Sequence, residues 1–366
     1  MNRLRKSTVL LLLLLIVSSV LAQQAAKQGD ANKVIYLKIP APSLKGNLLG
    51  DPAEQEIGIY LPPGYQASGS KRYPVLYLLH GYGGNPQSWF TSGQYAFNIT
   101  PVLDELMSSG KVREMIVVAP NGSNTFGGSF YVNSAASGNW EDFIVRDVVG
   151  YVDSNYRTLA RATSRGIAGH SMGGYGAIHA GMRNTDVFSS VYALSPCCLG
   201  LEGEFIDAAP GWKRLGTIKT REQMPKPIRS LEDFLVTVFT GTGAAFSPNA
   251  DRAPFYSDPL YLEKDGKLTQ DETVAAKWKR KMPLYLVAEH KSSLLALRGI
   301  FLDYGEKEEF SHIRSTTARF SLVLSENGVP HTFEVYPDGD HGSHVRERLE
   351  KKVFVFFSDR LDFSTP

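Results

Sequence analysis

The chain has only two cysteines among its 366 residues, and they are neighbours, Cys197 and Cys198. Adjacent Cα atoms lie about 3.8 Å apart, below the usual disulfide range, so a bond between them would be strained. We therefore expect two small residues packed at a strand end, in a fold that does not depend on disulfides. Because histidine, cysteine and acidic residues do not occur at metal-ligand spacings, we also expect no metal and no organic cofactor.

The sequence also lacks an excess of charge of either sign. Its formal net charge is +2, and removing the basic residues Arg3, Arg5 and Lys6 near the N-terminus leaves −1. We therefore expect no nucleic acid and no anionic membrane as a partner. The short basic run at residues 277–281 is interpreted as a solvated helix face.

A single strongly hydrophobic run occurs, close to the start. Residues 9–17 are rich in leucine, follow a basic segment, and lead to small residues ending at Ala22. This order is typical of a signal peptide, and the run is too short and one-sided for a transmembrane helix. We expect residues 1–22 to be cleaved and the protein to be secreted or periplasmic, free of the membrane. Residues 23–366 then form one large α/β domain.

Buried or alternating apolar runs predict the strands of a sheet, and apolar residues at helical spacing predict the helices between them. Expected strands cover residues 34–39, 55–61, 74–79, 115–119, 190–194, 283–287, 299–302 and 332–336. Expected helices cover residues 101–109, 140–155, 175–182, 316–324 and 344–357. This alternation predicts an α/β fold with a mostly parallel sheet and helices on both faces.

One segment interrupts the alternation. Residues 199–281 are rich in proline, glycine and charge, and predict only one helix, over 230–239. Such a long connection between strands is uncommon unless it has a function. We interpret it as an insertion that caps or flanks the active site.

The most informative motif is RGIAGHSMGG at residues 165–174. A short apolar run ends at Gly169, Ser171 follows, and a helix of small residues begins after Gly173. Nucleophilic serines lie on such sharp strand-to-helix turns, where glycines let the backbone close and the next N–H points at the developing oxyanion. Ser171 is therefore the candidate nucleophile.

A serine nucleophile needs a histidine base and a carboxylate that orients the base. Among the eight histidines, His341 directly follows the strand at 332–336, where the mechanism requires the base, and His344 is the weaker alternative. The acid should follow the strand at 299–302. Spacing alone leaves four candidates there, Asp303, Glu306, Glu308 and Glu309. The glycine-rich residues 80–84, after an earlier strand, are expected to supply a second oxyanion N–H.

Four segments resemble the secreted "putative esterase" family of α/β-hydrolases, which contains esterase D (S-formylglutathione hydrolase), bacterial feruloyl esterases and antigen 85 mycolyltransferases. The similar segments are LHGYGG at 79–84, NWEDF at 139–143, SRGIAGHSMGG at 164–174, and YP followed by GDH within 336–341. The resemblance covers nearly all of residues 34–361 apart from the insertion.

The resemblance implies an α/β-hydrolase fold and a serine esterase. In the family, the acid lies three residues after a glycine that ends its strand, and counting from Gly305 gives Glu308. The implied catalytic residues are Ser171, Glu308 and His341. The family pattern also places the oxyanion N–H groups at Tyr82 and Met172.

The expected reaction is hydrolysis of a small-molecule or carbohydrate-linked carboxylic ester, feruloyl esters among them, through an acyl-enzyme. An acyltransferase that delivers the acyl group to a sugar hydroxyl would use the same triad. A non-catalytic binding module is an alternative of another class. Formylglutathione hydrolysis is disfavoured, because that thioester is cytosolic and the chain carries an export signal.

Aromatic residues near the serine are candidates for substrate binding. Trp140, Phe130 and Tyr131 lie in or beside the glycine-rich segment 121–139, and the insertion adds further rings at Trp212, Phe255 and Tyr256. Such rings can stack a flat or sugar-like group. They can equally pack the insertion against the sheet, and the sequence does not decide between the two.

Overall fold

The computed structural model describes residues 34–93 and 96–365, so the expected signal peptide lies outside the described residues. An eight-stranded sheet forms its centre, in the order β1-β2-β6-β3-β9-β10-β13-β14. The strands are β1 (Val34–Pro40), β2 (Glu54–Tyr60), β3 (Val75–Leu79), β6 (Ile116–Pro120), β9 (Arg165–His170), β10 (Ser190–Leu194), β13 (Gly299–Gly305) and β14 (Thr332–Tyr336). β2 pairs antiparallel with both of its neighbours, and from β6 to β14 every pairing is parallel.

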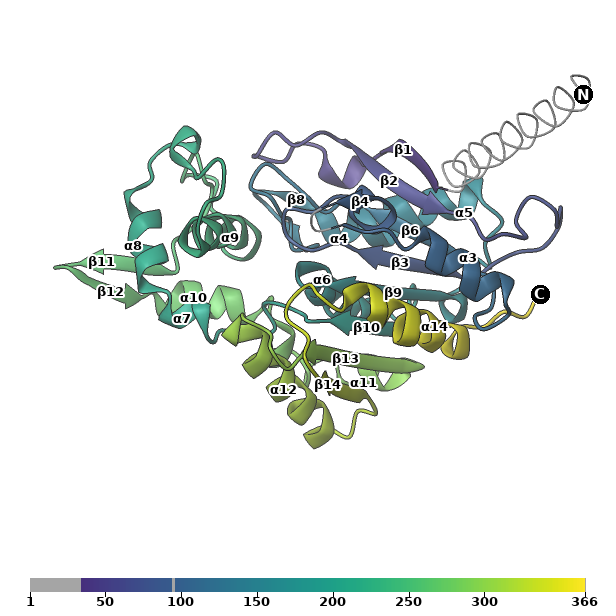
Figure 1. Cartoon of the computed structure of the whole chain (residues 1–366). Coiled ribbons are helices and arrows are strands. Elements are labelled where there is room, and N and C mark those ends of the chain that lie inside the picture. The colour runs from purple at the N-terminus through teal and green to yellow at the C-terminus, as the bar shows by residue number, and fades with distance from the viewer. Residues whose placement is uncertain (1–33, 94–95, 366) are drawn as a thin grey trace, which may run out of the picture.

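Helices cover both faces of this sheet, because alternate side chains of its central strands point into two separate cores. In β3, Val75, Tyr77 and Leu79 join one core and Leu76 and Leu78 the other. The first face is covered by α5 (Val149–Asn155), α6 (Met172–Arg183), α11 (Lys291–Ala296) and α12 (Ser311–Glu326), and the second by α3 (Thr100–Ser108), α13 (Val345–Arg348) and α14 (Phe354–Arg360) (Figure 1). The predicted α/β fold is therefore confirmed.

Most of the predicted elements are present, and one is wrong. The strands expected at 190–194 and 332–336 are β10 and β14 with the same bounds. Residues 283–287, expected as a strand, instead contain the 3₁₀ helix η5 (Pro283–Tyr285). Leu284 and Val287 are buried as a strand would bury them. A short apolar run is compatible with either structure, and here proline begins a helical turn.

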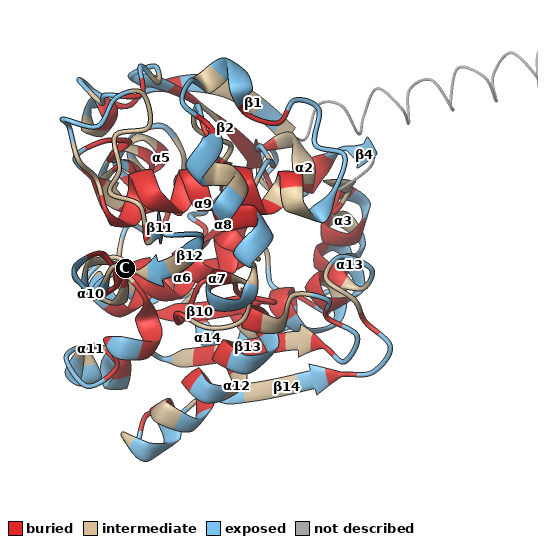
Figure 2. Cartoon of the chain, turned by 90° about the vertical axis from the view of Figure 1, so that its left-hand side faces the viewer, coloured by how far each residue is buried: buried red, intermediate tan, exposed pale blue. Residues whose placement is uncertain are grey.

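The insertion at 199–281 forms a lobe beside the sheet, at the left of Figure 1 and facing the viewer in Figure 2. Only one of its four α-helices was predicted. They are α7 (Glu204–Asp207), α8 (Ala209–Thr217), α9 (Leu231–Phe246) and α10 (Glu272–Lys279), and a hairpin of β11 (Tyr261–Lys264) and β12 (Lys267–Gln270) projects from them.

Aromatic packing holds the lobe together. The ring of Trp212 stacks on Phe239 with centroids 3.8 Å apart, and Phe255 lies 6.0 Å from Phe126. These rings of the insertion, together with Tyr256, belong to hydrophobic clusters. At these positions the packing interpretation is the one that the structure supports.

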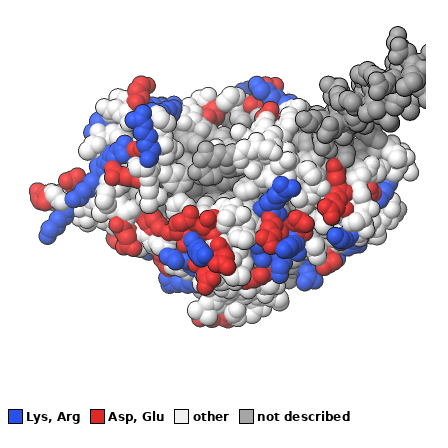
Figure 3. All heavy atoms as spheres, in the orientation of Figure 1, with Lys and Arg blue, Asp and Glu red and all other residues white. Residues whose placement is uncertain are grey.

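The remaining elements are short. They are η1 (Pro42–Leu44), α2 (Gln87–Phe90), β4 (Ser92–Gly93), β5 (Ala96–Phe97), β7 (Asn133–Ser134), β8 (Gly138–Asn139), α4 (Trp140–Asp142), the π-helical η2 (Phe143–Val148), η3 (Ala162–Ser164), η4 (Arg221–Gln223) and the π-helical η6 (Leu349–Val353). Within residues 34–93 and 96–365, no helix is long and apolar enough to cross a membrane. On the face shown in Figure 3, basic and acidic side chains are interspersed.

Candidate active site

Ser171 lies on the turn between β9 and α6 in a conformation that few residues other than glycine adopt. Its φ is 57° and its ψ is −117°, in the left-handed half of the backbone map. Hydrogen bonds on both sides fix this backbone: Ser171 N–H donates to Leu194 O at 2.9 Å, and Ser171 O accepts from Cys197 N–H at 3.1 Å. Strain of this kind is retained where the surrounding structure enforces it, and it is common at functional sites.

The glycines on either side of the turn are there because the backbone passes too close for a side chain. A Cβ on Gly169 would lie 2.3 Å from the carbonyl carbon of Gly173, and a Cβ on Gly173 would lie 2.1 Å from Leu79 O. Any larger residue at either position would push α6 away from the sheet. The sequence signal G-x-S-x-G therefore has a steric cause in this chain.

The structure brings His341 and Glu308 together. Nδ1 of His341 lies 2.8 Å from Oε2 of Glu308, whose side chain is fully buried, while His341 is partly accessible. The loops that carry them meet where β13 ends, and a Cβ on Gly305 would lie 2.1 Å from Gly339 O. Glu306 N–H donates to Tyr336 O and Lys307 N–H donates to Gly339 O, each at 2.8 Å, so backbone hydrogen bonds hold the acid and base loops together.

His341 also lies against the elbow. Nε2 of His170 lies 2.7 Å from the carbonyl oxygen of His341, and the two ring centroids are 4.6 Å apart. Burial, followed by the nearby His341, lowers the pKa of His170 to about 3, so its ring is neutral and Nε2–H donates. In the sequence motif, His170 has no role beyond its place beside Ser171. Its contact with His341 joins residues 171 positions apart, and no sequence pattern predicts it.

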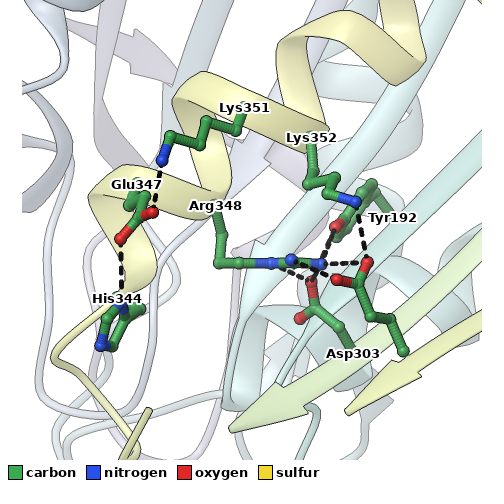
Figure 4. Close-up of polar contacts among 8 residues, drawn as sticks. Tyr192, Asp303, His344, Glu347, Arg348, Lys351 and Lys352 are labelled. Atoms are coloured by element: carbon green, nitrogen blue, oxygen red, sulfur yellow. Dashed lines mark hydrogen bonds and ion pairs between the residues drawn. The ribbon is translucent and has the colours of Figure 1, made fainter. Parts of the chain in front are cut away.

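Asp303 is not the partner of His341. Its buried carboxylate Oδ2 accepts from Arg348 at 2.6 Å and from the Tyr192 hydroxyl at 2.7 Å (Figure 4). Burial, opposed mainly by Arg348, raises the pKa of Asp303 to about 6. Arg348 also pairs with Glu334 at 3.0 Å. This network ties α13 to the sheet beneath the site.

The other candidate acids and bases are placed differently from Glu308 and His341. Glu306 is exposed, and Glu309 uses Oε2 to accept the backbone N–H of His341 at 2.8 Å. His344 lies on the surface, with Nδ1 2.9 Å from Glu347, as Figure 4 shows. The geometry therefore singles out Glu308 and His341.

Tyr82, in the loop after β3, and Met172, at the start of α6, lie on either side of Ser171 in the site. Met172 is the first residue of α6, where N–H groups have no acceptor within the helix. A Cβ on Gly128 would lie 2.5 Å from both the Tyr82 ring and the Met172 sulfur, so both side chains face the same glycine. A Cβ on Gly81 would lie 3.5 Å from Ser171 Cβ, which brings the loop of Tyr82 to the elbow.

A largely apolar cavity, here called the Ser171 cavity, opens beside the serine. Its wall includes Phe130, α9 residues such as Phe234 and Val238, and Phe310. Phe310 also packs edge-on against the His341 ring, with centroids 5.0 Å apart. The cavity therefore connects the elbow, the insertion and the acid loop.

Of the three aromatic residues expected to bind substrate, only Phe130 lines this cavity. Trp140 is fully buried, and its Nε1–H donates to Ser137 O at 2.7 Å. Tyr131 is also buried, and its hydroxyl donates to His80 O at 2.9 Å. Both are packing residues of the core, which a sequence pattern does not distinguish from ligand-stacking residues. No group of three or more His, Cys, Asp or Glu side chains among the described residues could hold a metal ion.

Comparison with known proteins identifies the family to which this chain belongs. The sequence profile of the "Putative esterase" family matches residues 52–352. The chain belongs to this esterase family. A stretch of 126 residues is 36% identical to an esterase of Mycobacterium tuberculosis, covering 33% of this chain and 25% of that protein.

A stretch of 125 residues is 35% identical to an endo-1,4-β-xylanase/feruloyl esterase of Xylanibacter ruminicola, covering 33% of this chain and 16% of that protein. The matches thus span a quarter or less of the length of these two curated relatives. The fold resembles a ferulic acid esterase, with a TM-score of 0.60 and 22% identity over 90% of this chain and 98% of the other.

The fold also resembles the S-formylglutathione hydrolase of Agrobacterium tumefaciens, with a TM-score of 0.56 and 16% identity over 90% of this chain and 95% of the other. At such low identities, likeness to solved structures establishes the fold alone. The α/β-hydrolase fold and the esterase family predicted from the motifs are therefore confirmed.

Proposed function

We propose that the chain hydrolyses carboxylic esters through an acyl-enzyme, with Ser171 as nucleophile, His341 as base and Glu308 as the acid that orients the base. The observation that carries the proposal is the 2.8 Å contact between His341 Nδ1 and buried Glu308, made beside an elbow serine. With Nδ1–H donating to Glu308, Nε2 is the nitrogen that can take the proton of Ser171.

The reaction then proceeds in two halves. Ser171 Oγ attacks the carbonyl carbon while His341 takes its proton, and the resulting oxyanion accepts the N–H groups of Tyr82 and Met172. Collapse of this intermediate expels the alcohol, which receives the proton from His341. Water then attacks the acyl-enzyme with His341 again as base, releasing the carboxylic acid and free Ser171.

We also propose the kind of ester. The Ser171 cavity is lined by aromatic rings, including Phe130, Phe234 and Phe310, and such walls favour a flat apolar acyl group. One relative that shares part of its sequence with the chain is named a feruloyl esterase. Hydroxycinnamoyl esters of carbohydrates are therefore the first substrates to test. The leader at residues 1–22 supports export to the periplasm or the medium as a further proposal.

The decisive experiment combines labelling with turnover. We expect an organophosphonate to add one phosphonyl group to Ser171, shown by peptide mass spectrometry, and the Ser171→Ala variant to lose both labelling and turnover of every ester. Aryl acetates, short acyl esters and feruloyl esters should be compared on purified protein. Ser171→Ala retaining more than a few per cent of activity on any of them would contradict the mechanism.

The same experiment separates hydrolysis from acyl transfer. Free acid should account for all of the acyl group released in water. If an added sugar diverts most of the acyl group from free acid to a sugar ester, the enzyme is instead an acyltransferase using the same three residues.

A further inference from the structure

A second imidazole–carboxylate pair lies in the wall of the Ser171 cavity. Nδ1 of His312 lies 2.5 Å from Oε2 of Glu204, and both residues line the cavity. Glu204 comes from α7 of the insertion and His312 from the first turn of α12. None of the proposed catalytic steps uses this pair.

The carboxylate of Glu204 is fully engaged. Its Oε1 accepts from Ser311 N–H at 2.7 Å and from Ser311 Oγ–H at 2.9 Å, and its Oε2 also accepts from His312 N–H at 2.9 Å. Glu204 therefore caps the start of α12, where a negative charge is favoured. Although partial burial opposes ionisation, the hydrogen bond and charge of His312 hold the pKa of Glu204 well below its usual range.

The Cys197 thiol lies in the same cavity wall as the His312 ring and interacts with it. Nε2 of His312 is buried and has no hydrogen-bond partner in the described part of the chain. Cys197 also lines the cavity, and its backbone N–H donates to Ser171 O at 3.1 Å. A thiol and a hydrogen-bonded imidazole–carboxylate pair thus share one wall of this cavity.

The charges in this group favour a thiolate. Burial opposes ionisation of Cys197, but hydrogen bonds with Cys198 and His312 outweigh it and lower the pKa of the Cys197 thiol. Burial likewise opposes protonation of His312, but Cys197 and Glu204 outweigh it and raise its pKa to about 9. Cys198, in contrast, has a pKa raised well above its ordinary value, first by burial and then by Cys197.

We propose that Cys197, activated by the His312–Glu204 pair, is a second nucleophile in the Ser171 cavity and a site of covalent modification by small uncharged carbon electrophiles. Haloacetamides and α,β-unsaturated amides are small uncharged members of this class and carry the soft electrophilic carbon that a thiolate attacks. A cysteine beside an imidazolium is nucleophilic for the same reason in thiol enzymes generally. The inference does not depend on ester hydrolysis, because modification is read from the mass of the protein.

The reaction with iodoacetamide shows the balance of atoms. The Cys197 thiolate attacks the CH₂ carbon, an S–C bond forms, the C–I bond breaks, and iodide leaves with the bonding pair. The thiol proton stays on His312, which remains paired with Glu204. The carbamoylmethyl group then occupies the cavity next to Ser171, so modification should also block esters from binding there.

Other titratable groups face the two cysteines and shape the pH dependence. The positive form of His341 favours a Cys197 thiolate, and the charges of both thiols act on the Tyr175 hydroxyl. Because the Tyr175 pKa is raised well above its usual value, first by burial, Tyr175 stays neutral through the range in which Cys197 titrates. The onset of reactivity therefore reports mainly on Cys197 and His312.

The test measures alkylation of the folded full chain with iodoacetamide, by intact mass and peptide mapping. We expect one adduct, on Cys197, formed at pH 7 at least tenfold faster than in the His312→Asn variant. The apparent pKa for alkylation should lie below about 8.5, the ordinary value of a free thiol. Cys198→Ser is the matched control and should label as the parent does, whereas Cys197→Ser should not label.

Two further samples keep the result decisive. Ser171→Ala should label at Cys197 at the parent rate, which separates this inference from the esterase mechanism. In urea both thiols should label, which checks the reagent. If His312→Asn does not fold, Glu204→Gln and the pH profile of the parent take its place. No adduct on the folded parent, an adduct on Cys198 alone, or a rate unchanged by loss of His312 would overturn the proposal.

Discussion

Nε2 of His170 lies 2.7 Å from the carbonyl oxygen of His341, so the residue before the elbow serine holds the loop that carries the proposed base. Replacing His170 by alanine should remove this contact and let the His341 loop move. We expect kcat to fall on the order of 10-fold to 100-fold with KM nearly unchanged, since a misplaced catalytic group lowers the rate at the bound substrate.

His170→Gln is the matched control for this prediction. Its side-chain amide can donate to the same carbonyl oxygen, so it should restore most of kcat. Steady-state kinetics on one aryl ester checks both variants. If glutamine is no better than alanine, or if only KM changes, His170 does not act by positioning His341.

Glu308→Gln should lower kcat on the order of 10²-fold to 10⁴-fold, because an amide cannot stabilise the His341 imidazolium as a buried carboxylate does. Glu306→Gln, at an exposed neighbour, should stay within about twofold of the parent. Kinetics at saturating ester on the two variants checks the assignment. A larger loss at Glu306 would refute it.

Asp303→Asn should act on stability rather than on chemistry. It weakens a buried pair with Arg348, and breaking such pairs costs on the order of 3 kcal/mol of unfolding free energy. Because Arg348 keeps its ion pair with Glu334, the loss of unfolding free energy should lie toward the lower end of the range for such pairs. Urea unfolding and kcat measured side by side test this expectation. A large loss of kcat at unchanged stability would mean that Asp303, not Glu308, serves the base.

Acid should destabilise the fold through its buried neutral histidines. Burial lowers the pKa of His80 to about 4 and is the main cause that lowers that of His170 to about 3, against 6.5 for an unperturbed side chain. The unfolded chain therefore binds more protons below pH 6.5, and stability falls as the pH drops from there toward 4. Each histidine should contribute about 2 kcal/mol of loss at pH 5.

Two groups act in the opposite direction and must be allowed for. The raised pKa of Asp303, about 6, stabilises the fold as the pH falls from 6 toward 3.8. His312, with a pKa of about 9, gives stability that is complete below 6.5 and lost as the pH rises through 9. The urea unfolding midpoints of the parent and of His170→Gln, each measured at pH 7 and pH 5, isolate the contribution of His170 to the pH dependence. An equal pH dependence in both proteins would contradict the prediction.

The sequence could predict those features that depend on neighbouring residues. β10 and β14 have continuous or alternating apolar runs with clear ends, so their bounds were predicted, and the elbow glycines are required by local backbone contacts. The distance of Glu308 from Gly305 needed the family resemblance, because spacing alone left four acids open. Once the chain folds, burial separates them: Glu308 is enclosed and Glu306 is exposed.

Features that depend on distant residues could not be predicted. α8 contains Pro210, Gly211 and Gly216, a poor helix by propensity, yet Trp212 stacks on Phe239 of α9 and stabilises it. The contact of Glu204 with His312 spans 108 positions, and neither residue belongs to a motif. The core positions of Trp140 and Tyr131 are likewise set by tertiary packing.

The last prediction concerns acyl specificity. Val238 of α9 lines the Ser171 cavity, so Val238→Trp should fill the space proposed for the acyl group. We expect kcat/KM for a feruloyl ester to fall at least tenfold more than kcat/KM for an acetate of the same alcohol, because only the larger acyl group needs that space. Leu231→Trp, at a 58% exposed position of the same helix, is the control and should change neither value by more than about twofold. Equal losses on both esters, with circular dichroism showing an intact fold, would mean that α9 supports the catalytic residues rather than the acyl group. No change on either would place the acyl group outside this cavity.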